Sequence, residues 1–217
     1  MSTDPMPGNK PKPAGQTPTP RDATRKFLLP IVGFLMAVLV LGAGAMMFLG
    51  GSLPDGPVVG GTFSLLDGDG KRVTDRDLRG AYLLVYFGYT FCPDICPTTL
   101  NQIAEALDIL GPKGKNLRPV FITVDPGRDT PGVMKQYAAS FTPRLLPLTG
   151  SDAEIADVAR KFRVYYAPHR TGDKPGDYTM DHSSVLYLMD PQGKFVAPLR
   201  ADAPAAELAA NLSKQLK

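Results

Sequence analysis

The chain has 217 residues, of which 43% are hydrophobic and 21% are charged, a composition that fits one globular domain with an additional segment and excludes an intrinsically disordered protein. Its two cysteines are too few for the disulfide framework of a small secreted scaffold, or to hold an iron–sulfur cluster by themselves. Residues 1–26 carry the whole net charge of +3, because basic and acidic residues are equally numerous in the rest of the chain, and this neutral remainder argues against nucleic acid as a partner.

An uncharged, apolar segment of 23 residues runs from Phe27 to Leu49. As a helix it would be about 34 Å long, which is enough to cross the hydrocarbon core of a membrane. Basic residues lie directly before it, ending at Lys26, and the next Lys or Arg is Lys71. The positive-inside rule therefore predicts a single transmembrane helix at residues 27–49, with residues 1–26 in the cytoplasm and the rest of the chain exported.

A cleaved signal peptide is the alternative for this segment, because Ala43-Gly44-Ala45 resembles a small-residue cleavage site. The long basic region before the apolar run, and its continuation to Leu49, favour an uncleaved anchor. Residues 1–26 are rich in proline and predicted to be disordered, with too few arginines for a mitochondrial transit helix. We therefore expect a bacterial inner-membrane protein whose main domain lies in the periplasm, behind a Gly/Pro-rich linker at residues 50–61.

Residues 62–217 alternate strands and helices along the chain. A turn signature at Asp67–Gly70 separates two short strands, which predicts a β-hairpin at the start of this region. Ala81–Phe87 is a continuous apolar run typical of a central strand covered on both faces. The elements predicted after it are a helix at Pro97–Leu110, a strand at Pro119–Val124, a helix from Thr130 and Pro131, a strand at Leu145–Leu148, a helix capped by Ser151 and Glu154, a hairpin of Val185–Met189 and Lys194–Ala197, and a final helix through Leu208 and Leu216.

This order of elements predicts the fold class, an α/β, thioredoxin-like sandwich with an N-terminal β-hairpin, tethered by one transmembrane helix. The length of the region is ample for one hydrophobic core. We therefore expect residues 62–217 to form one thioredoxin-like domain.

Both cysteines lie within five residues, in Cys92-Pro93-Asp94-Ile95-Cys96, between the predicted central strand and the helix after it. Sulfurs spaced in this way can share one side of a helical turn, where unpaired N–H groups favour the thiolate that binds metals and attacks disulfides. A structural disulfide would close too small a loop to stabilise the fold much, and inert buried thiols are unusual in an oxidising compartment. The pair is therefore predicted to be functional.

Two histidines could complete a metal site with these cysteines. His169 lies in a Pro/Gly-rich stretch and is predicted to be a solvated loop residue. His182 comes just before the strand Val185–Met189. In thioredoxin-type folds the loop that enters this strand faces the cysteine loop, so we expect His182 to lie near Cys92 and Cys96.

Two thiolates and one imidazole suit copper, since Cu(I) accepts three ligands whereas structural zinc requires a fourth from the protein. The residues beside His182 allow two readings. Asp181 either orients the histidine ring or is a solvated loop carboxylate, and both remain open. Met180 is a conceivable soft ligand, but a core or loop position is expected for it.

Three separated motifs stand out along the chain, the cysteine stretch Tyr86–Pro97, the stretch Val124–Pro131 and the stretch Asp181–Ser184. Together they resemble the motifs of the Sco/SenC (synthesis of cytochrome oxidase) family. The resemblance covers roughly residues 55–215, and the single N-terminal anchor is also similar to the layout of that family. It implies a thioredoxin-like domain that binds one copper ion, as Cu(I), Cu(II) or both.

The ligands that this resemblance implies are Cys92, Cys96 and His182. It implies a membrane-anchored copper chaperone, not an enzyme, that assists assembly of the dinuclear copper site on subunit II of cytochrome c oxidase. The implied partners are that subunit, periplasmic copper donor proteins, and the membrane through residues 27–49. For the stretch Asp125–Pro131 we expect a strand-to-helix connection, although a place beside the site or a docking surface is also conceivable.

Two other functions remain open. A thiol–disulfide reductase would use Cys92 and Cys96 as a redox-active pair that keeps the cysteines of subunit II reduced, although the usual motif has two intervening residues rather than three. A reductase has no need of His182, which makes this residue the discriminating one. A redox or copper sensor is the other alternative. A peroxiredoxin is disfavoured, because Tyr89 occupies the position three residues before Cys92 where that family has threonine.

Overall fold

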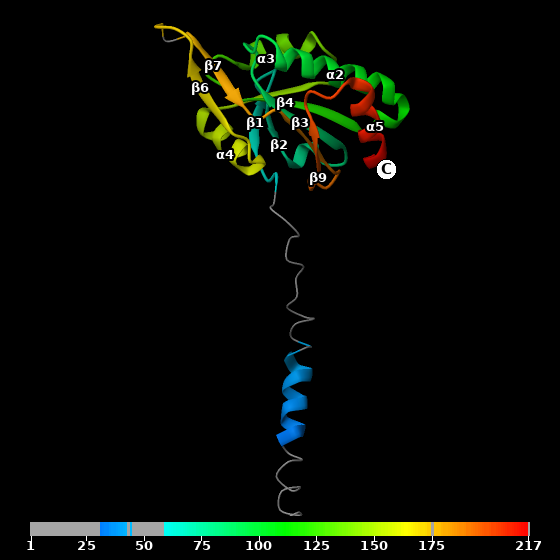
Figure 1. The fold of residues 1–217 in the computed structure, drawn as a ribbon. Helices are drawn as coiled ribbons and strands as arrows, with labels where there is room; N and C mark the ends of the chain where they lie inside the picture. The colour runs from blue at the N-terminus through cyan, green and yellow to red at the C-terminus, as the bar shows by residue number, and fades with distance from the viewer. Residues whose placement is uncertain (1–30, 43, 45–58, 175, 217) are drawn as a thin grey trace, which may run out of the picture. The chain divides into compact units, whose positions relative to one another are not determined.

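The computed structural model describes residues 31–42, 44, 59–174 and 176–216 (Figure 1). The predicted cytoplasmic tail, most of the predicted linker and both ends of the predicted transmembrane segment lie outside these residues. Residues 31–42 are helical, with exposed side chains. Among the helices that the structure describes, none has the length and apolar character needed to span a membrane. The chain divides into two compact units, Met1–Asp55 and Gly56–Lys217.

A seven-stranded mixed sheet forms the centre of the second unit (Figure 1). Strands β3, β4 and β5 are parallel, β8 runs antiparallel to β3, and β9 and the β1–β2 hairpin extend the sheet at its two edges. The spatial order is β2-β1-β5-β4-β3-β8-β9. The strands are β1 Ser64–Asp67, β2 Arg72–Thr74, β3 Tyr82–Gly88, β4 Leu117–Thr123, β5 Leu146–Thr149, β8 Val185–Met189 and β9 Phe195–Arg200.

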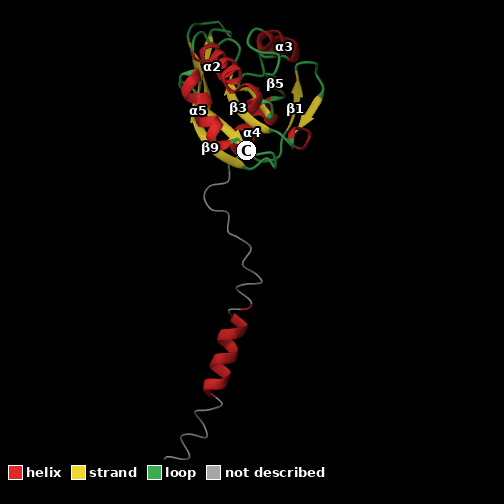
Figure 2. Cartoon of the chain, turned by 90° about the vertical axis from the view of Figure 1, so that its right-hand side faces the viewer, coloured by secondary structure: helices red, strands yellow, loops and turns green. Residues whose placement is uncertain are grey.

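Helices cover both faces of this sheet. Side chains alternate along β3, so that Tyr86 packs on Phe121 of β4 while Phe87 packs on Phe162 of α4 and on Tyr187 of β8. Figure 2 shows α2 and α5 lying beside each other against the sheet. The helices are α2 Ile95–Leu110, α3 Pro131–Ala139, α4 Asp152–Phe162 and α5 Ala205–Gln215, with short 3-10 turns at Arg76–Leu78 and Gly111–Gly114.

Local sequence signals account for most of these elements. Every residue of β3 is buried, as the continuous apolar run predicted. Ser151 and Glu154 form a complete capping box at the start of α4. Thr130 occupies the N-cap position of α3 as predicted, although its side chain makes no capping hydrogen bond. These features and the mixed sheet confirm the predicted α/β, thioredoxin-like fold with an N-terminal hairpin.

The structure contains one hairpin that the sequence did not predict. Residues Tyr166–Arg170 and Tyr178–His182 form strands β6 and β7, a separate antiparallel pair that extends beyond the main sheet (Figure 1). The sequence predicted a loop here, because Pro168 and nearby glycines weaken a strand signal. The two strands pair with each other, with Arg170 opposite Tyr178 and Tyr166 opposite His182.

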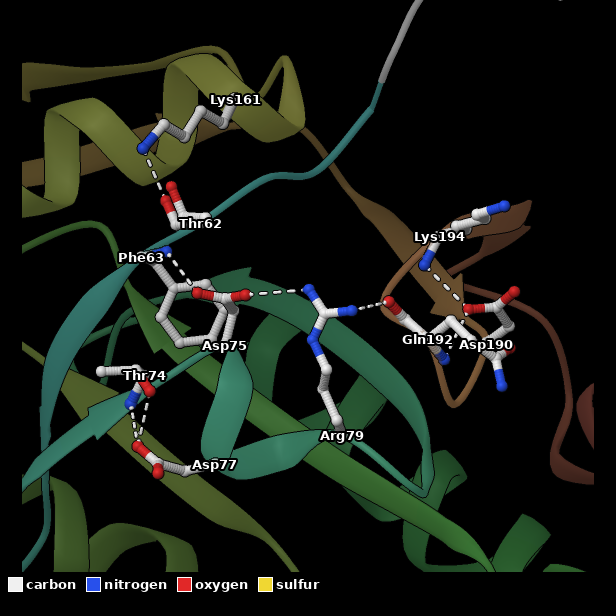
Figure 3. Close-up of polar contacts among 10 residues, drawn as sticks. All are labelled: Thr62, Phe63, Thr74, Asp75, Asp77, Arg79, Lys161, Asp190, Gln192 and Lys194. Atoms are coloured by element: carbon white, nitrogen blue, oxygen red, sulfur yellow. Dashed lines mark hydrogen bonds and ion pairs between the residues drawn. The ribbon is translucent and has the colours of Figure 1, made fainter. Parts of the chain in front are cut away.

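Side-chain bridges fix the chain at the end of β3 remote from the cysteines (Figure 3). Arg79 donates to the Asp75 carboxylate at 3.3 Å and to the Gln192 carbonyl in the turn between β8 and β9. Asp75 also accepts from the Phe63 backbone N–H at 3.3 Å. Lys161 of α4 donates to the Thr62 carbonyl at 2.5 Å. The segment entering β1 is thereby tied to the helix and turn beside it.

Candidate metal centre

The cysteine loop leaves the carboxyl end of β3 and leads directly into α2. Gly88, the last residue of β3, lies so close to α2 that a Cβ atom there would come within 2.7 Å of the Cys96 sulfur and 2.9 Å of the Phe121 ring. Cys92 is in the loop and half-buried, whereas Cys96 is in the first turn of α2 and fully buried. The two sulfurs therefore meet at the start of a helix, as the sequence predicted.

His182 ends β7 and places its ring against the cysteines. Its Nε2 atom lies 3.5 Å from the Cys96 Sγ, and the Nε2 and the two Sγ atoms all lie within 4.8 Å of one another. The ring packs edge-on against Tyr86 and Tyr89, at centroid distances of 6.2 and 6.0 Å. These aromatic contacts fix the ring beside the sulfurs.

The carbonyl of Ser183 orients the imidazole ring. It lies 3.2 Å from His182 Nδ1, and because a carbonyl can only accept, Nδ1 carries a hydrogen. In the neutral ring with its hydrogen on Nδ1, the Nε2 lone pair is directed at the sulfurs. The sequence left open whether Asp181 orients the ring or is a solvated carboxylate; it is exposed, and the Ser183 carbonyl makes the contact with the ring. The residue type at 183 carries no sequence signal for a backbone contact, so the carbonyl could not have been predicted.

The pKa values of the two thiols are shifted in opposite directions. A hydrogen bond from the Cys96 thiol, with further support from His182 and backbone N–H groups, lowers the pKa of Cys92 to about 3 against the opposing effect of burial. The same hydrogen bond and strong burial raise the pKa of Cys96. The backbone N–H of Cys96 also points to Cys92 Sγ at 3.4 Å. At neutral pH the pair therefore presents a thiolate at Cys92, with the remaining proton on Cys96.

Tyr86 is a further contact to the buried sulfur that the sequence did not single out. Its hydroxyl donates to Cys96 Sγ at 3.7 Å, and its side chain is fully buried. Burial, then the neighbouring cysteine charges, raises the pKa of Tyr86, so it stays a hydrogen-bond donor. The signal that could have found it is its position on the predicted central strand, two residues before the glycine that approaches Cys96.

The remaining candidate residues lie apart from this cluster or at its margin. His169 is on β6 and exposed. Met180 is 8% exposed, belongs to the core and lines the same open groove of about 400 Å³ as Cys92 and His182. The Asp125–Pro131 connection joins β4 to α3 as predicted, and it also lies beside the cysteine loop, since Asp129 accepts from the Thr90 backbone N–H at 3.0 Å.

Comparison with known proteins identifies the family. The sequence model of the SCO1/SenC family matches residues 52–217. The chain is 46% identical over 155 residues to protein sco1 of Schizosaccharomyces pombe, covering 70% of this chain and 59% of that protein. It is 40% identical over 183 residues to an SCO2-like protein of Rickettsia prowazekii, covering 78% of this chain and 89% of that protein.

Solved structures agree with the sequence comparison. The structure of Bradyrhizobium japonicum ScoI with copper bound is 47% identical, with a TM-score of 0.67 over 73% of this chain and 99% of that one. Yeast Sco1 with copper bound is 38% identical, with a TM-score of 0.68 over 73% of this chain and 88% of that one. Motifs, fold and sequence similarity along most of its length thus make this chain a member of the SCO1/SenC family.

Proposed function

We propose that this chain is a copper chaperone that binds one copper ion through the sulfurs of Cys92 and Cys96 and the Nε2 atom of His182. The observation that carries the proposal is the convergence of these three donors, all within 4.8 Å of one another, from segments 86 residues apart. Copper is the cargo, and the receiving partner is the dinuclear copper site on subunit II of cytochrome c oxidase. Family membership and the copper-bound structures of related proteins support this assignment.

The chemistry of the donors fits copper. Thiolates are soft ligands that select Cu(I), and a set of two sulfurs and one nitrogen satisfies its preference for low coordination. Cys92 is half-exposed beside an open groove, so an incoming thiol can reach the metal from that side. Cys96 and its Tyr86 hydrogen bond lie beneath it. The half-exposed position of Cys92 allows the copper ion to leave. The buried contacts of Cys96 preserve the geometry of the site after the ion has left.

The location of the domain completes the proposal. Residues 27–49 anchor the chain in a bacterial inner membrane, residues 1–26 form a cytoplasmic tail, and residues 50–61 link the anchor to a copper-binding domain at 62–217 in the periplasm. The basic residues before the apolar segment and their absence directly after it support this orientation. Periplasmic copper donor proteins would supply the metal in the compartment where subunit II receives it.

A second candidate function is reduction of the disulfide of subunit II. The lowered pKa of the half-exposed Cys92 favours it, because a thiolate is the attacking species in thiol–disulfide exchange. Cys92 would attack the partner's disulfide, and Cys96 would then displace the partner's thiol. The chain would end as the Cys92–Cys96 disulfide, and the partner would end with two reduced cysteines.

A transfer experiment separates the two functions. The reduced chain in detergent, loaded with one Cu(I), is mixed with the reduced copper-binding domain of subunit II, and copper is measured in each protein after separation. We expect copper to move to subunit II, with His169→Ala behaving as the unaltered chain. A loaded chain that keeps its copper, together with a metal-free chain that reduces oxidised subunit II, would replace the chaperone assignment by the reductase.

A further inference from the structure

The connection between β4 and α3 places Arg128 between the two halves of the candidate metal centre. The Arg128 side chain is only 19% exposed, although arginine is usually a surface residue. Its neighbours come from the loop that carries Cys92 and from strand β7, which ends at His182. Arg128 therefore touches both segments that must meet to form the site.

The contacts to β7 form a closed set around Tyr178. Arg128 Nη1 donates to the Tyr178 carbonyl at 3.0 Å, and the guanidinium carbon lies 3.7 Å from the centroid of the Tyr178 ring. The Tyr178 hydroxyl donates to Asp125 Oδ1 at 2.8 Å, while Asp125 Oδ2 is ion-paired with Arg128 Nε. Tyr178 cannot move without weakening its contacts to Arg128 and to Asp125, and His182 lies on the same strand.

The contacts to the cysteine loop are aromatic. The guanidinium carbon lies 4.8 Å from the centroid of Phe91 and 5.8 Å from that of Tyr89. Phe91 directly precedes Cys92, and the Tyr89 ring packs against the His182 ring. Arg128 thus contacts Phe91, the sequence neighbour of Cys92, and also Tyr89, whose ring packs on that of His182.

Asp129 makes the base of this arrangement rigid. It is fully buried and accepts hydrogen bonds from Thr90 N–H at 3.0 Å, from Thr90 Oγ1 at 2.5 Å and from Thr123 Oγ1 at 2.6 Å. The connection is therefore fixed both to β4 and to the cysteine loop. A long side chain projecting from such a base can hold a separate element at a defined distance.

The β6–β7 hairpin needs such support, since in the part of the chain that the structure describes it forms a two-stranded sheet separate from the main one. We propose that Arg128 is a positioning residue that holds β7 against the cysteine loop, so that His182 reaches the metal bound by Cys92 and Cys96. This inference rests on the proposed copper site.

A double-mutant cycle tests the proposal on the full, reduced chain in detergent. Cu(I) affinity is measured by competition with a chelator for the unaltered chain, Arg128→Met, His182→Ala and the double variant. We expect Arg128→Met to weaken binding about tenfold, the loss usual when a group that orients a metal ligand is removed. In the His182→Ala background it should change affinity less than twofold, because the remaining cysteine pair does not depend on β7.

The two backgrounds distinguish positioning from a general effect on the fold. An equal loss in both backgrounds, or no loss in either, would overturn the proposal. If His182→Ala itself binds as tightly as the unaltered chain, the copper site as proposed fails, and the positioning role fails with it. Electron paramagnetic resonance of the Cu(II) complexes gives an independent readout, with the nitrogen coupling of the unaltered chain lost or weakened in Arg128→Met.

Two further variants exclude simpler explanations. Arg128→Lys keeps the charge but cannot donate to Asp125 and to the Tyr178 carbonyl in the same forked geometry, so it should not restore affinity. Full restoration would show that charge alone matters and would contradict positioning. Arg79→Met is the matched control, since Arg79 also bridges a carboxylate and a carbonyl, but at the far end of β3 (Figure 3). It should leave copper affinity unchanged.

Discussion

Cys92 and Cys96 are four residues apart and have opposite roles in the site. Cys92 is half-exposed and accepts hydrogen bonds from the Cys96 backbone and thiol, so its charge is stabilised. Cys96 is fully buried between Gly88, Tyr86 and His182, where a second negative charge would be costly. The half-exposed sulfur of Cys92 is thus suited to pass the metal to a partner, and the buried sulfur of Cys96 is suited to remain a fixed ligand.

This difference predicts the pH dependence of alkylation. In the reduced, metal-free chain, iodoacetamide should modify Cys92 at a rate that changes little from pH 8 down to pH 5, because its pKa of about 3 keeps it a thiolate throughout. An ordinary thiol loses reactivity about tenfold per pH unit below its pKa. Peptide mapping by mass spectrometry identifies the modified residue and measures the rate at each pH.

The unfolded chain is the control for this experiment. In urea the hydrogen bonds to Cys92 are lost, so both cysteines should react and should show the ordinary pH dependence. A tenfold fall per pH unit in the native chain, or faster modification of Cys96 than of Cys92, would show that the thiolate is not where the structure places it.

At the scale of elements, the close approach of β3 and α2 sets the sulfur positions. A side chain at Gly88 would overlap the Cys96 sulfur and the Phe121 ring. We expect Gly88→Ala to lower the free energy of unfolding by about 1–3 kcal/mol, the usual cost of overpacking, and to weaken copper binding because the sulfur is displaced. Urea unfolding of the metal-free chain and chelator competition measure the two effects.

Gly132 supplies the matched control. It lies in α3 with nothing within 4 Å of an added Cβ atom, and alanine favours a helix more than glycine does. Gly132→Ala should therefore keep or slightly raise stability and leave copper affinity unchanged. Equal stability of the two variants would contradict the tight packing described for the junction of β3 and α2.

The elements that sequence predicted are those with strong local signals. The buried run of β3, the capping box of α4 and the turn between β8 and β9 are each encoded by a few consecutive residues. The structure has all three where they were expected. The β6–β7 hairpin was missed because most residues of β6 are exposed, so that this strand has no buried apolar pattern, and because it pairs across the residues between Arg170 and Tyr178. Local patterns carry little information about such pairing.

The same reasoning separates the predictable from the unpredictable parts of the site. The cysteine spacing and the topology of the fold sufficed to bring His182 toward Cys92 and Cys96. The Ser183 carbonyl and the Arg128 contacts could not be predicted, since they depend on backbone orientation and on a side chain that reaches a residue 50 positions away. Sequence motifs identify which residues can bind the metal, whereas the contacts that support those residues become visible only in the structure.

At the scale of the whole molecule, metal binding joins distant parts of the second unit. One copper ion held by the cysteine loop and by the end of β7 would connect the segment after β3 of the main sheet with the separate β6–β7 pair. A ligand that binds only the folded chain raises its stability by mass action. The copper-loaded domain is therefore expected to be more resistant to unfolding than the metal-free one, and the ligand set decides by how much.

The three-ligand copper site can be tested by a Cu(I) titration of the reduced chain against a chelator of known affinity, comparing the unaltered chain with His182→Ala and His169→Ala. We expect one tightly bound copper ion, a loss of affinity of at least tenfold in His182→Ala, and no change in His169→Ala, whose side chain is exposed on β6 away from the sulfurs. Equal binding by His182→Ala and the unaltered chain would contradict the three-ligand site on which the chaperone function depends.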